Sequence, residues 1–218
     1  MITRRHAVAG LAGTLVLGGR ALGAEGRDDL IALPDKAPLV KRTFRPPNYE
    51  TPLGDLRHEF TPNDKFFVRY HLAHIPELDV HKWRLRVGGE SASRAREWSL
   101  DELKRSFEIV SIAAINQCSG YRRGLFTPRV PGVQWEHGAI GNAMWTGVRL
   151  RDVLSSAGVR NDAIEVVFDG ADSGQLPRTP DFVKSLPLDR ALDENTLIAF
   201  EMNGKPLPHW NGEQARLV

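Results

Sequence analysis

The chain has 218 residues, of which 41% are hydrophobic and 26% charged; this composition excludes a disordered or collagen-like chain and suffices for one domain with a hydrophobic core. Its single cysteine, Cys118, excludes an internal disulfide and the zinc or iron–sulfur sites that need several cysteines. The 29 Lys and Arg residues balance the 27 Asp and Glu residues, and 26 remain without the three arginines of the first 24 positions, so the charge gives no indication of nucleic-acid binding.

Residues 1–24 have the pattern of an export signal. Arg4 and Arg5 precede an uncharged stretch, Ala7 to Gly19, and small residues between Ala21 and Ala24 suit a signal peptidase. The uncharged stretch is shorter than the roughly 20 residues that span a bilayer. The paired arginines resemble a twin-arginine signal, with an ordinary secretory signal as the alternative. Both predict a periplasmic protein with no integral membrane association.

The proline-rich residues 25–62 show no sustained periodicity and predict an extended lead-in, so that residues 63–218 form the domain proper. Regular structure is expected to begin within Lys65–Leu72, followed by a strand at Trp83–Val87. Ser99 and Glu102 have the spacing of a capping box, which predicts a helix over Ser99–Phe107.

The second half of the chain alternates short strands with short helices. A buried strand is expected at Ile109–Ile115, ending just before Gln117 and Cys118. The remaining expected elements are a helix at Val148–Ala157 stopped by Gly158, a strand at Ile164–Phe168, a helix from Thr179 to about Leu186, a strand at Leu197–Met202 with a turn at Asn203–Gly204, and the start of a strand at Gln214–Val218. Without a regular strand–helix alternation, this mixture predicts an α+β fold.

Two segments contain the residues best suited to chemistry: FFVRYH at Phe66–His71 and NQCSGYRRG at Asn116–Gly124. Motifs for phosphate loops, zincins and serine hydrolases are lacking. Arginines beside Cys118 favour the thiolate, the form that attacks or binds metal, whereas the alternative is an inert core thiol. On the residues alone, the structural interpretation is favoured in each case: an inert core thiol for Cys118, a surface ion pair for Arg69 and a structural histidine for His71.

Four ordered segments resemble the sulfite oxidase family of molybdenum-cofactor enzymes. They are FFVRYH, NQCSGYRRGLF, GAIGNAMWTGVRLRDVL (Gly138–Leu154) and MNGKPLP (Met202–Pro208). The likeness runs from about Arg27 to the last residue and is greatest to the molybdenum subunits of bacterial sulfite:cytochrome c oxidoreductases. It implies an α+β, sulfite-oxidase-type molybdopterin-binding domain of mixed sheets and short helices.

The resemblance also implies roles for individual residues. Cys118 would be the protein's ligand to molybdenum, whose other sulfur ligands come from molybdopterin. Arg69 and Arg123 would form a cationic pocket for an oxyanion, which suits the planar guanidinium group, and His71 would orient substrate or water. The positions that match the family's cofactor-binding residues are Phe67, Val68, Arg69, Tyr70, His71, Cys118, Asp172, Asn211 and Arg216.

The implied reaction is oxidation of sulfite to sulfate by oxo transfer. The chain lacks Cys-x-x-Cys-His, so no haem site is expected, and electrons would pass to an external c-type cytochrome. One alternative is a relative that acts on another oxo substrate, a sulfoxide or a sulfane sulfur group. From a different functional class, the alternative is a truncated, non-catalytic pterin-binding remnant.

Two departures from the family pattern stand out. Tyr121 occupies a position where relatives carry asparagine, which leaves the true substrate open. Relatives also continue beyond this length to complete the molybdenum domain and to add an immunoglobulin-like dimerisation domain. We therefore expect a fragment or truncated product that lacks this C-terminal domain, and we leave the oligomer partner open.

Overall fold

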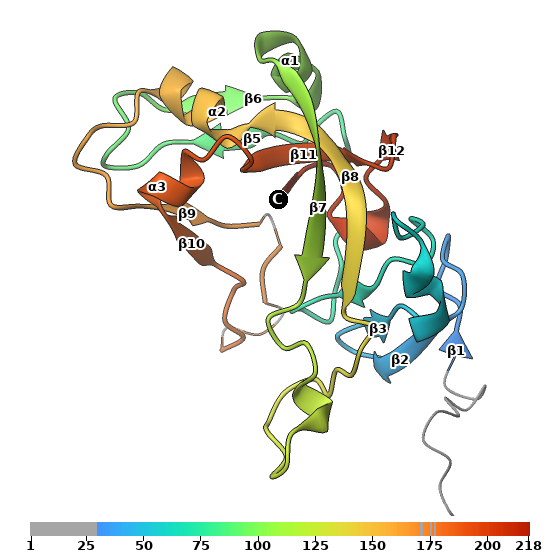
Figure 1. The fold of residues 1–218 in the computed structure, drawn as a ribbon. Coiled ribbons are helices and arrows are strands. Elements are labelled where there is room, and N and C mark those ends of the chain that lie inside the picture. Colours follow the sequence, from blue (N-terminus) through green and yellow to red (C-terminus); the bar gives the residue numbers. More distant parts are fainter. Residues whose placement is uncertain (1–29, 171, 175, 177) are drawn as a thin grey trace, which may run out of the picture.

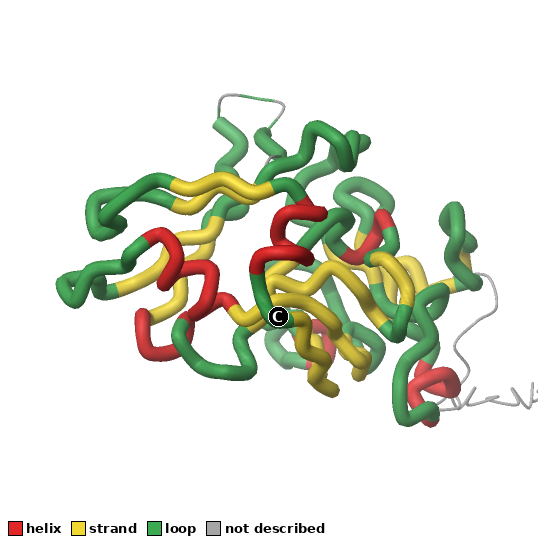
Figure 2. Tube along the Cα trace, turned by 90° about the horizontal axis from the view of Figure 1, so that it is seen from above, coloured by secondary structure: helices red, strands yellow, loops and turns green. Residues whose placement is uncertain are grey.

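The computed structural model describes residues 30–170, 172–174, 176 and 178–218. Its regular elements are short strands in four antiparallel sheets, with three short α-helices among the described residues (Figures 1 and 2). This arrangement confirms the predicted α+β fold. The predicted export signal at residues 1–24 lies outside the described residues.

The largest sheet has the strand order β12–β11–β8–β7, and β13 also pairs with β11. Its strands are β7 (Ile109–Gln117), β8 (Ile140–Arg149), β11 (Leu197–Met202), β12 (Lys205–Pro206) and β13 (Arg216–Leu217). In Figure 1, β7 and β8 form one long hairpin, and the loop between them, residues 118–139, extends away from the rest of the sheet. This loop contains the short 3-10 helix η3 (Arg123–Leu125).

β7 corrects the prediction of a buried strand at Ile109–Ile115. It continues to Gln117, and its odd-numbered residues are exposed, with Ile109 49% and Ile115 66% accessible. The odd-numbered side chains share one face of β7, which is not covered, whereas the even-numbered side chains on the other face are partly buried. An apolar run identifies a strand but does not show whether both of its faces are covered.

Strand β8 was not anticipated, and it displaces the start of the predicted helix at Val148–Ala157. Val148 and Arg149 are still part of β8, paired with β11, so that α2 spans Leu150–Ala157. The expected apolar face of α2 is confirmed, because its buried residues are Leu150, Val153, Leu154 and Ala157. Gly158 ends the helix in the left-handed conformation, with φ of 68°, as predicted.

The N-terminal segment contains more regular structure than expected. Before Lys65 the chain already forms three strands and a 3-10 helix, and β4 completes a sheet of order β1–β2–β3–β4. The elements are β1 (Leu30–Ile31), β2 (Leu39–Thr43), β3 (Asn48–Glu50), η2 (Leu53–Arg57) and β4 (Val68–Arg69). The prolines that suggested irregular chain lie between these strands, where they do not interrupt a ladder.

Other local predictions had mixed outcomes. The capping box is present, with Ser99 and Glu102 bonded reciprocally at the start of α1 (Leu100–Ser106). The helix predicted from Thr179 to Leu186 is wrong: residues 184–187 form a strand, and α3 begins only after Pro187. Sheet pairing outweighs the local capping signal there. The elements concerned are β5 (Leu85–Val87), β6 (Arg96–Trp98), β9 (Glu165–Phe168), β10 (Lys184–Pro187) and α3 (Leu188–Ala191).

The β11–β12 turn confirms the prediction at Asn203–Gly204, since both residues have positive φ, 54° and 73°. Three hydrophobic clusters form the core, and the one centred on Phe66, Trp135 and Trp145 supports the candidate site. No helix among the described residues has both the length and the apolar character needed to cross a membrane.

Candidate functional site

Phe66 and Phe67 fix the position of the FFVRYH segment. Both rings are buried, 5.3 Å apart, and Phe67 meets Trp135 edge-on at 6.5 Å. Val68 and Arg69 then pair with β3. The Val68 side chain is fully buried in the N-terminal sheet, so only its backbone can contribute to binding. Arg69 and the residues after it are placed at the boundary of the core.

A buried lysine joins this segment to the C-terminal part of the chain. Lys36 is 7% exposed, and its Nζ donates to the carbonyl of Asn63 at 2.6 Å, to that of Phe66 at 3.1 Å and to Asn211 Oδ1 at 2.6 Å. Asn211 Nδ2 in turn donates to the Phe67 carbonyl at 3.1 Å. Burial lowers the pKa of Lys36 to about 7, against the opposing effect of Asp64.

Asn211 ends the 3-10 helix η4 (His209–Asn211), which packs beside β4. Tyr70 is tied to the same helix, because its hydroxyl donates to the His209 carbonyl at 2.7 Å. Burial raises the pKa of Tyr70 to about 12; nearby Arg216 opposes this rise, and Asp172 adds to it. Asp172 therefore lies close enough to Tyr70 to act on it electrostatically.

Arg216 adds a buried cation to this group. Its Nη1 donates to the Asn211 carbonyl at 2.9 Å, and its Cζ lies 5.1 Å from the ring of Trp145. Its Nε is shielded from solvent and has no hydrogen-bond partner among the described residues. Burial lowers the pKa of Arg216 to about 10.

Cys118 lies one residue beyond β7, as the sequence predicted. Its amide donates to Ala139 at 3.0 Å, and its Sγ accepts the Gly120 N–H at 3.4 Å. The thiol is partly exposed and packs against the core cluster that contains Phe66 and Phe67. Tyr121 packs against the same cluster, and its amide donates to the Cys118 carbonyl at 2.9 Å.

Arg123 is positioned mainly by the space that two glycines leave. A Cβ added to Gly120 would lie 2.8 Å from the Arg123 guanidinium, and one added to Gly132 would lie 2.5 Å from Nη1. The backbone at Gly132 also has φ of 117°, which favours glycine. Among the described residues, the Arg123 guanidinium donates one hydrogen bond, a long one of 3.4 Å from Nη1 to the Val133 carbonyl.

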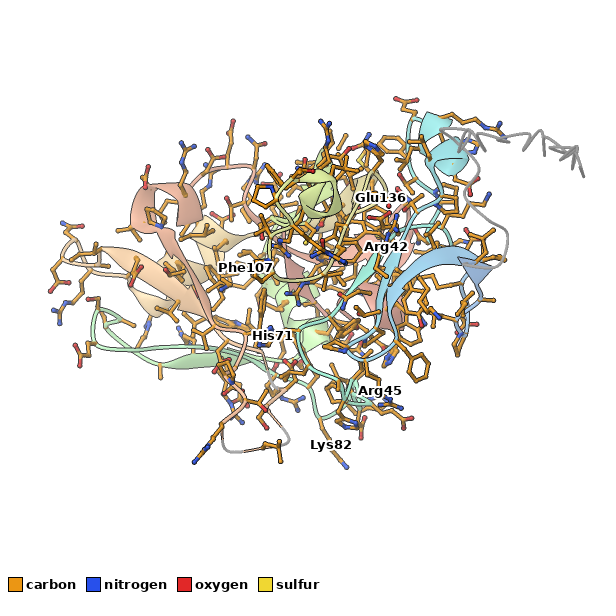
Figure 3. The ribbon with its side chains drawn as sticks, turned by 90° about the horizontal axis from the view of Figure 1, so that it is seen from below. Arg42, Arg45, His71, Lys82, Phe107 and Glu136 are labelled. Carbon is orange, nitrogen blue, oxygen red and sulfur yellow. The ribbon has the colours of Figure 1, made fainter. Side chains whose placement is uncertain are left out.

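The loop that contains Arg123 is anchored to the N-terminal sheet by charged groups. Arg42 Nη2 lies 2.7 Å from Glu50 and 3.0 Å from Glu136, and the buried Glu50 accepts the Glu136 amide. Figure 3 shows Arg42 and Glu136 next to each other. Removing one partner of a buried charged group costs free energy of folding. These contacts therefore hold the end of the loop near Glu136 against the N-terminal sheet.

The segment 180–184 covers Arg69 and His71. His71 Nε2 lies 2.9 Å from the Pro180 carbonyl, and its ring lies 5.5 Å from that of Phe182 (His71 is labelled in Figure 3). Because a carbonyl only accepts, Nε2 carries the proton. Arg69 Cζ lies 5.1 Å and Lys184 Nζ 5.0 Å from the centre of the same Phe182 ring.

The structure thus places the sequence-predicted residues in three groups. Arg69 and His71 share Phe182; Phe67, Tyr70, Asp172, Asn211 and Arg216 surround η4; Cys118 and Arg123 lie on the turn after β7. Sequence reasoning missed Lys36, Phe182 and Lys184. None of them lies in a motif, and only long-range contacts reveal them.

The residues present fit molybdopterin as a ligand. The shielded, unpartnered Nε of Arg216 is suited to an anion such as the pterin phosphate. Among the described residues, no three His, Cys, Asp or Glu side chains cluster as a metal site. The single thiol, Cys118, suits a metal whose other sulfur ligands belong to the cofactor and which needs only one protein thiol. The cavities of about 440 and 430 Å³ are lined by other residues and lie outside the site.

Comparisons with known proteins agree with these features. Residues 71–218 match the family described as oxidoreductase molybdopterin binding domain. The chain is 40% identical to mitochondrial sulfite oxidase of Mus musculus over 202 residues, which cover 89% of this chain and 36% of that protein. It is 30% identical to an NADPH nitrate reductase of Fusarium oxysporum, covering 83% of this chain and 20% of that protein.

Among solved structures, the sulfane dehydrogenase SoxCD of Paracoccus pantotrophus is similar, with a TM-score of 0.68 and 26% identity. The match covers 79% of this chain and 42% of that one. The chain spans about a third of the length of the mammalian sulfite oxidases that it matches.

Proposed function

The chain belongs to the sulfite oxidase family of molybdopterin-binding oxidoreductases, and from this premise we propose that it oxidises sulfite to sulfate and passes the electrons to an external c-type cytochrome. The observation that carries the proposal is the position of Cys118. The single thiol of the chain lies at the turn after β7, partly exposed, and packs against the core that also holds Phe67.

In this proposal the cofactor would be held by residues that the fold already orients. Cys118 Sγ would bind molybdenum, Arg216 would bind the pterin phosphate, and Asn211 would contribute from η4. The bound cofactor supplies two-electron redox chemistry and exchange of one oxygen atom. The protein excludes water from the pterin side by burying Asn211 and Phe67.

Arg69, Arg123 and His71 bind and orient the substrate. Sulfite and sulfate are small oxyanions, and guanidinium groups bind them through charge-assisted hydrogen bonds. The Arg69 guanidinium makes no hydrogen bond among the described residues and lies against the Phe182 ring, so its N–H groups are available. His71 keeps its Nε2 proton on Pro180, which orients the ring and leaves Nδ1 as the acceptor.

The test is stopped-flow reduction of a c-type cytochrome by sulfite, with molybdenum and pterin per polypeptide measured on the same sample. Sulfite-dependent reduction that scales with molybdenum content is the expected result. A molybdenum-loaded sample that does not reduce the cytochrome contradicts the proposal. A chain that folds but never holds metal is instead the non-catalytic remnant.

The likeness to a sulfane dehydrogenase favours one alternative substrate, a sulfane sulfur group. Tyr121 beside Cys118 adds to this alternative, because a phenol changes the shape and polarity next to the thiol. Turnover of sulfite, a thiosulfate-derived persulfide and a sulfoxide by the same loaded sample distinguishes the three. A higher kcat/KM for sulfite supports the first proposal.

We also propose export to the periplasm by the twin-arginine route. Arg4 and Arg5 precede the uncharged segment, and this route carries folded proteins, as a protein loaded with a cofactor requires. Replacement of both arginines by lysine is expected to stop export of the full chain, as followed by cell fractionation. Unchanged export by the lysine variant indicates an ordinary secretory signal.

A further inference from the structure

Two cationic side chains and a histidine lie against one aromatic ring at the edge of the candidate site. Arg69 comes from β4, Lys184 begins β10, and both lie about 5 Å from the centre of the Phe182 ring. The His71 ring lies 5.5 Å from the same centre. Residues more than a hundred positions apart in the sequence therefore meet at Phe182.

This positive charge is not neutralised within the described part of the chain. None of Arg69, His71 and Lys184 belongs to an ion pair there, whereas Arg42, on the neighbouring N-terminal sheet, is paired with Glu50 and Glu136. Asp181, the carboxylate closest in sequence to Phe182 and Lys184, accepts the Gly174 amide instead. Two fixed cations held together without a carboxylate repel each other, and a bound anion relieves this repulsion.

The ring explains how the cations stay together and remain accessible. The electron-rich ring of Phe182 attracts both cations. The ring is 45% exposed, so the segment does not seal the group from solvent. Neither the Arg69 guanidinium nor the Lys184 ammonium donates a hydrogen bond within the described residues, so their N–H groups are available to a ligand.

We propose that Lys184 and Phe182 complete an oxyanion-binding site with Arg69 and His71, and that this site selects a small dianion over a neutral oxo substrate. Lys184 supplies a second charged donor beside Arg69, and Phe182 is a positioning residue that holds Arg69 and Lys184. This inference rests on the proposed function, because it takes Arg69 and His71 as substrate residues. It adds the substrate class, since a sulfoxide or another neutral group gains little from Lys184.

Inorganic sulfate, which has the charge of the proposed product, is the probe. Its binding to the purified chain is measured by isothermal titration at low ionic strength, for the parent and for Lys184→Gln. Loss of one charge-assisted hydrogen bond is expected to weaken sulfate binding about tenfold. Lys184→Arg, which keeps the charge and the cation–π contact, is expected to restore most of the affinity.

Lys104 provides a matched control. Its Nζ lies 4.8 Å from the ring centre of Phe200, so it makes the same type of contact at a place with no role in the proposal. Lys104→Gln is expected to leave the affinity for sulfate unchanged. Equal losses in both variants, unchanged binding in Lys184→Gln, or no sulfate binding by the parent chain would each overturn the inference.

The binding measurement needs no turnover, so it separates this inference from the proposed function. Sulfate binding that depends on Lys184 without sulfite oxidation by a loaded sample removes the proposed function and leaves the anion site. Sulfite oxidation with a KM unaffected by Lys184→Gln removes the inference and leaves the proposed function. A raised KM for sulfite with little change in kcat supports both.

Discussion

Two sides of the candidate site are built differently. The buried wall, defined by Lys36, Phe67, Tyr70, Asn211 and Arg216, is joined by hydrogen bonds of 2.6 to 3.1 Å between side chains and carbonyls. The open wall, defined by Arg69, His71, Phe182 and Lys184, has one hydrogen bond to a carbonyl and several ring contacts of about 5 Å.

This difference matches the lifetimes of the two proposed ligands. A cofactor that stays bound benefits from a rigid wall in which every polar atom is placed in advance. A substrate that enters and leaves at each turnover needs donors that remain accessible to solvent. The single shielded atom without a partner on the buried wall, Arg216 Nε, is then the one that the cofactor would satisfy.

The largest expected effect is at Cys118, which shares its core cluster with the buried wall. Cys118→Ser is expected to abolish sulfite oxidation, a loss beyond the roughly hundredfold that removing an outer-shell partner of a metal costs. The fold is expected to persist, because serine is nearly isosteric and the thiol is only partly buried. Cytochrome reduction and circular dichroism of the loaded variant check both points.

The second prediction removes the cation of the buried wall. Arg216→Gln is expected to lower pterin and molybdenum retention about tenfold or more, because a charge-assisted bond to phosphate is lost. Pterin per polypeptide after extensive dialysis is the measurement. Retention equal to that of the parent chain would show that Arg216 serves only its contacts with Trp145 and Asn211.

The third prediction concerns the pH dependence of stability. Burial lowers the pKa of Lys36 in the folded state from its ordinary value of 10.5 to about 7. Between these values Lys36 binds fewer protons folded than unfolded, so stability rises with pH in this window. Burying the charged form costs the folded state a few kcal/mol below about pH 7. The free energy of unfolding of the parent chain, relative to Lys36→Met, is expected to increase from pH 7 to pH 10.

Urea unfolding of the parent and of Lys36→Met at several pH values checks this expectation. Asp64 is the charged group that opposes the lowered pKa, so Asp64→Asn is expected to steepen the pH dependence slightly. A difference between parent and variant that does not change with pH would mean that Lys36 stays charged in the folded protein.

The smallest expected effect is on the open wall. Phe182→Leu removes the ring that holds Arg69 and Lys184, a contact worth about 1 kcal/mol, so the KM for sulfite is expected to rise about fivefold with kcat nearly unchanged. Because the ring is half-exposed, the midpoint of thermal unfolding is expected to change little. Steady-state kinetics and a thermal melt distinguish this result from general destabilisation.

Local signals predicted those elements of the fold that short stretches determine. The capping box at Ser99 and Glu102, the glycine stop at Gly158 and the turn at Asn203–Gly204 all appear as expected. The wrong predictions concern elements whose structure is set by pairing between strands distant in sequence. Residues 184–187 lie in a segment with a helix signal but pair with β9 as a strand. A helix was predicted to start at Val148, but Val148 and Arg149 are the end of β8 and pair with β11.

The site divides in the same way. Arg69 and Cys118 were identifiable because they stand in ordered motifs, and Asn211 and Arg216 because the family resemblance extends past those motifs to the last residue. Lys36 stands in a proline-rich segment, and its role depends on Asn211, 175 positions away. Phe182 and Lys184 lie within a segment expected to be helical, and only the folded chain brings them to Arg69.

The position of Arg123 depends on two residues that have no side chain, Gly120 and Gly132. A mutation at either glycine codon can therefore alter substrate preference while every residue proposed to touch the substrate stays the same. Alanine at Gly132 would displace the guanidinium and would also meet an unfavourable backbone conformation. Substitution at either glycine, in nature or by engineering, can therefore change the pocket. A comparison of motifs centred on Arg123 does not detect such a change.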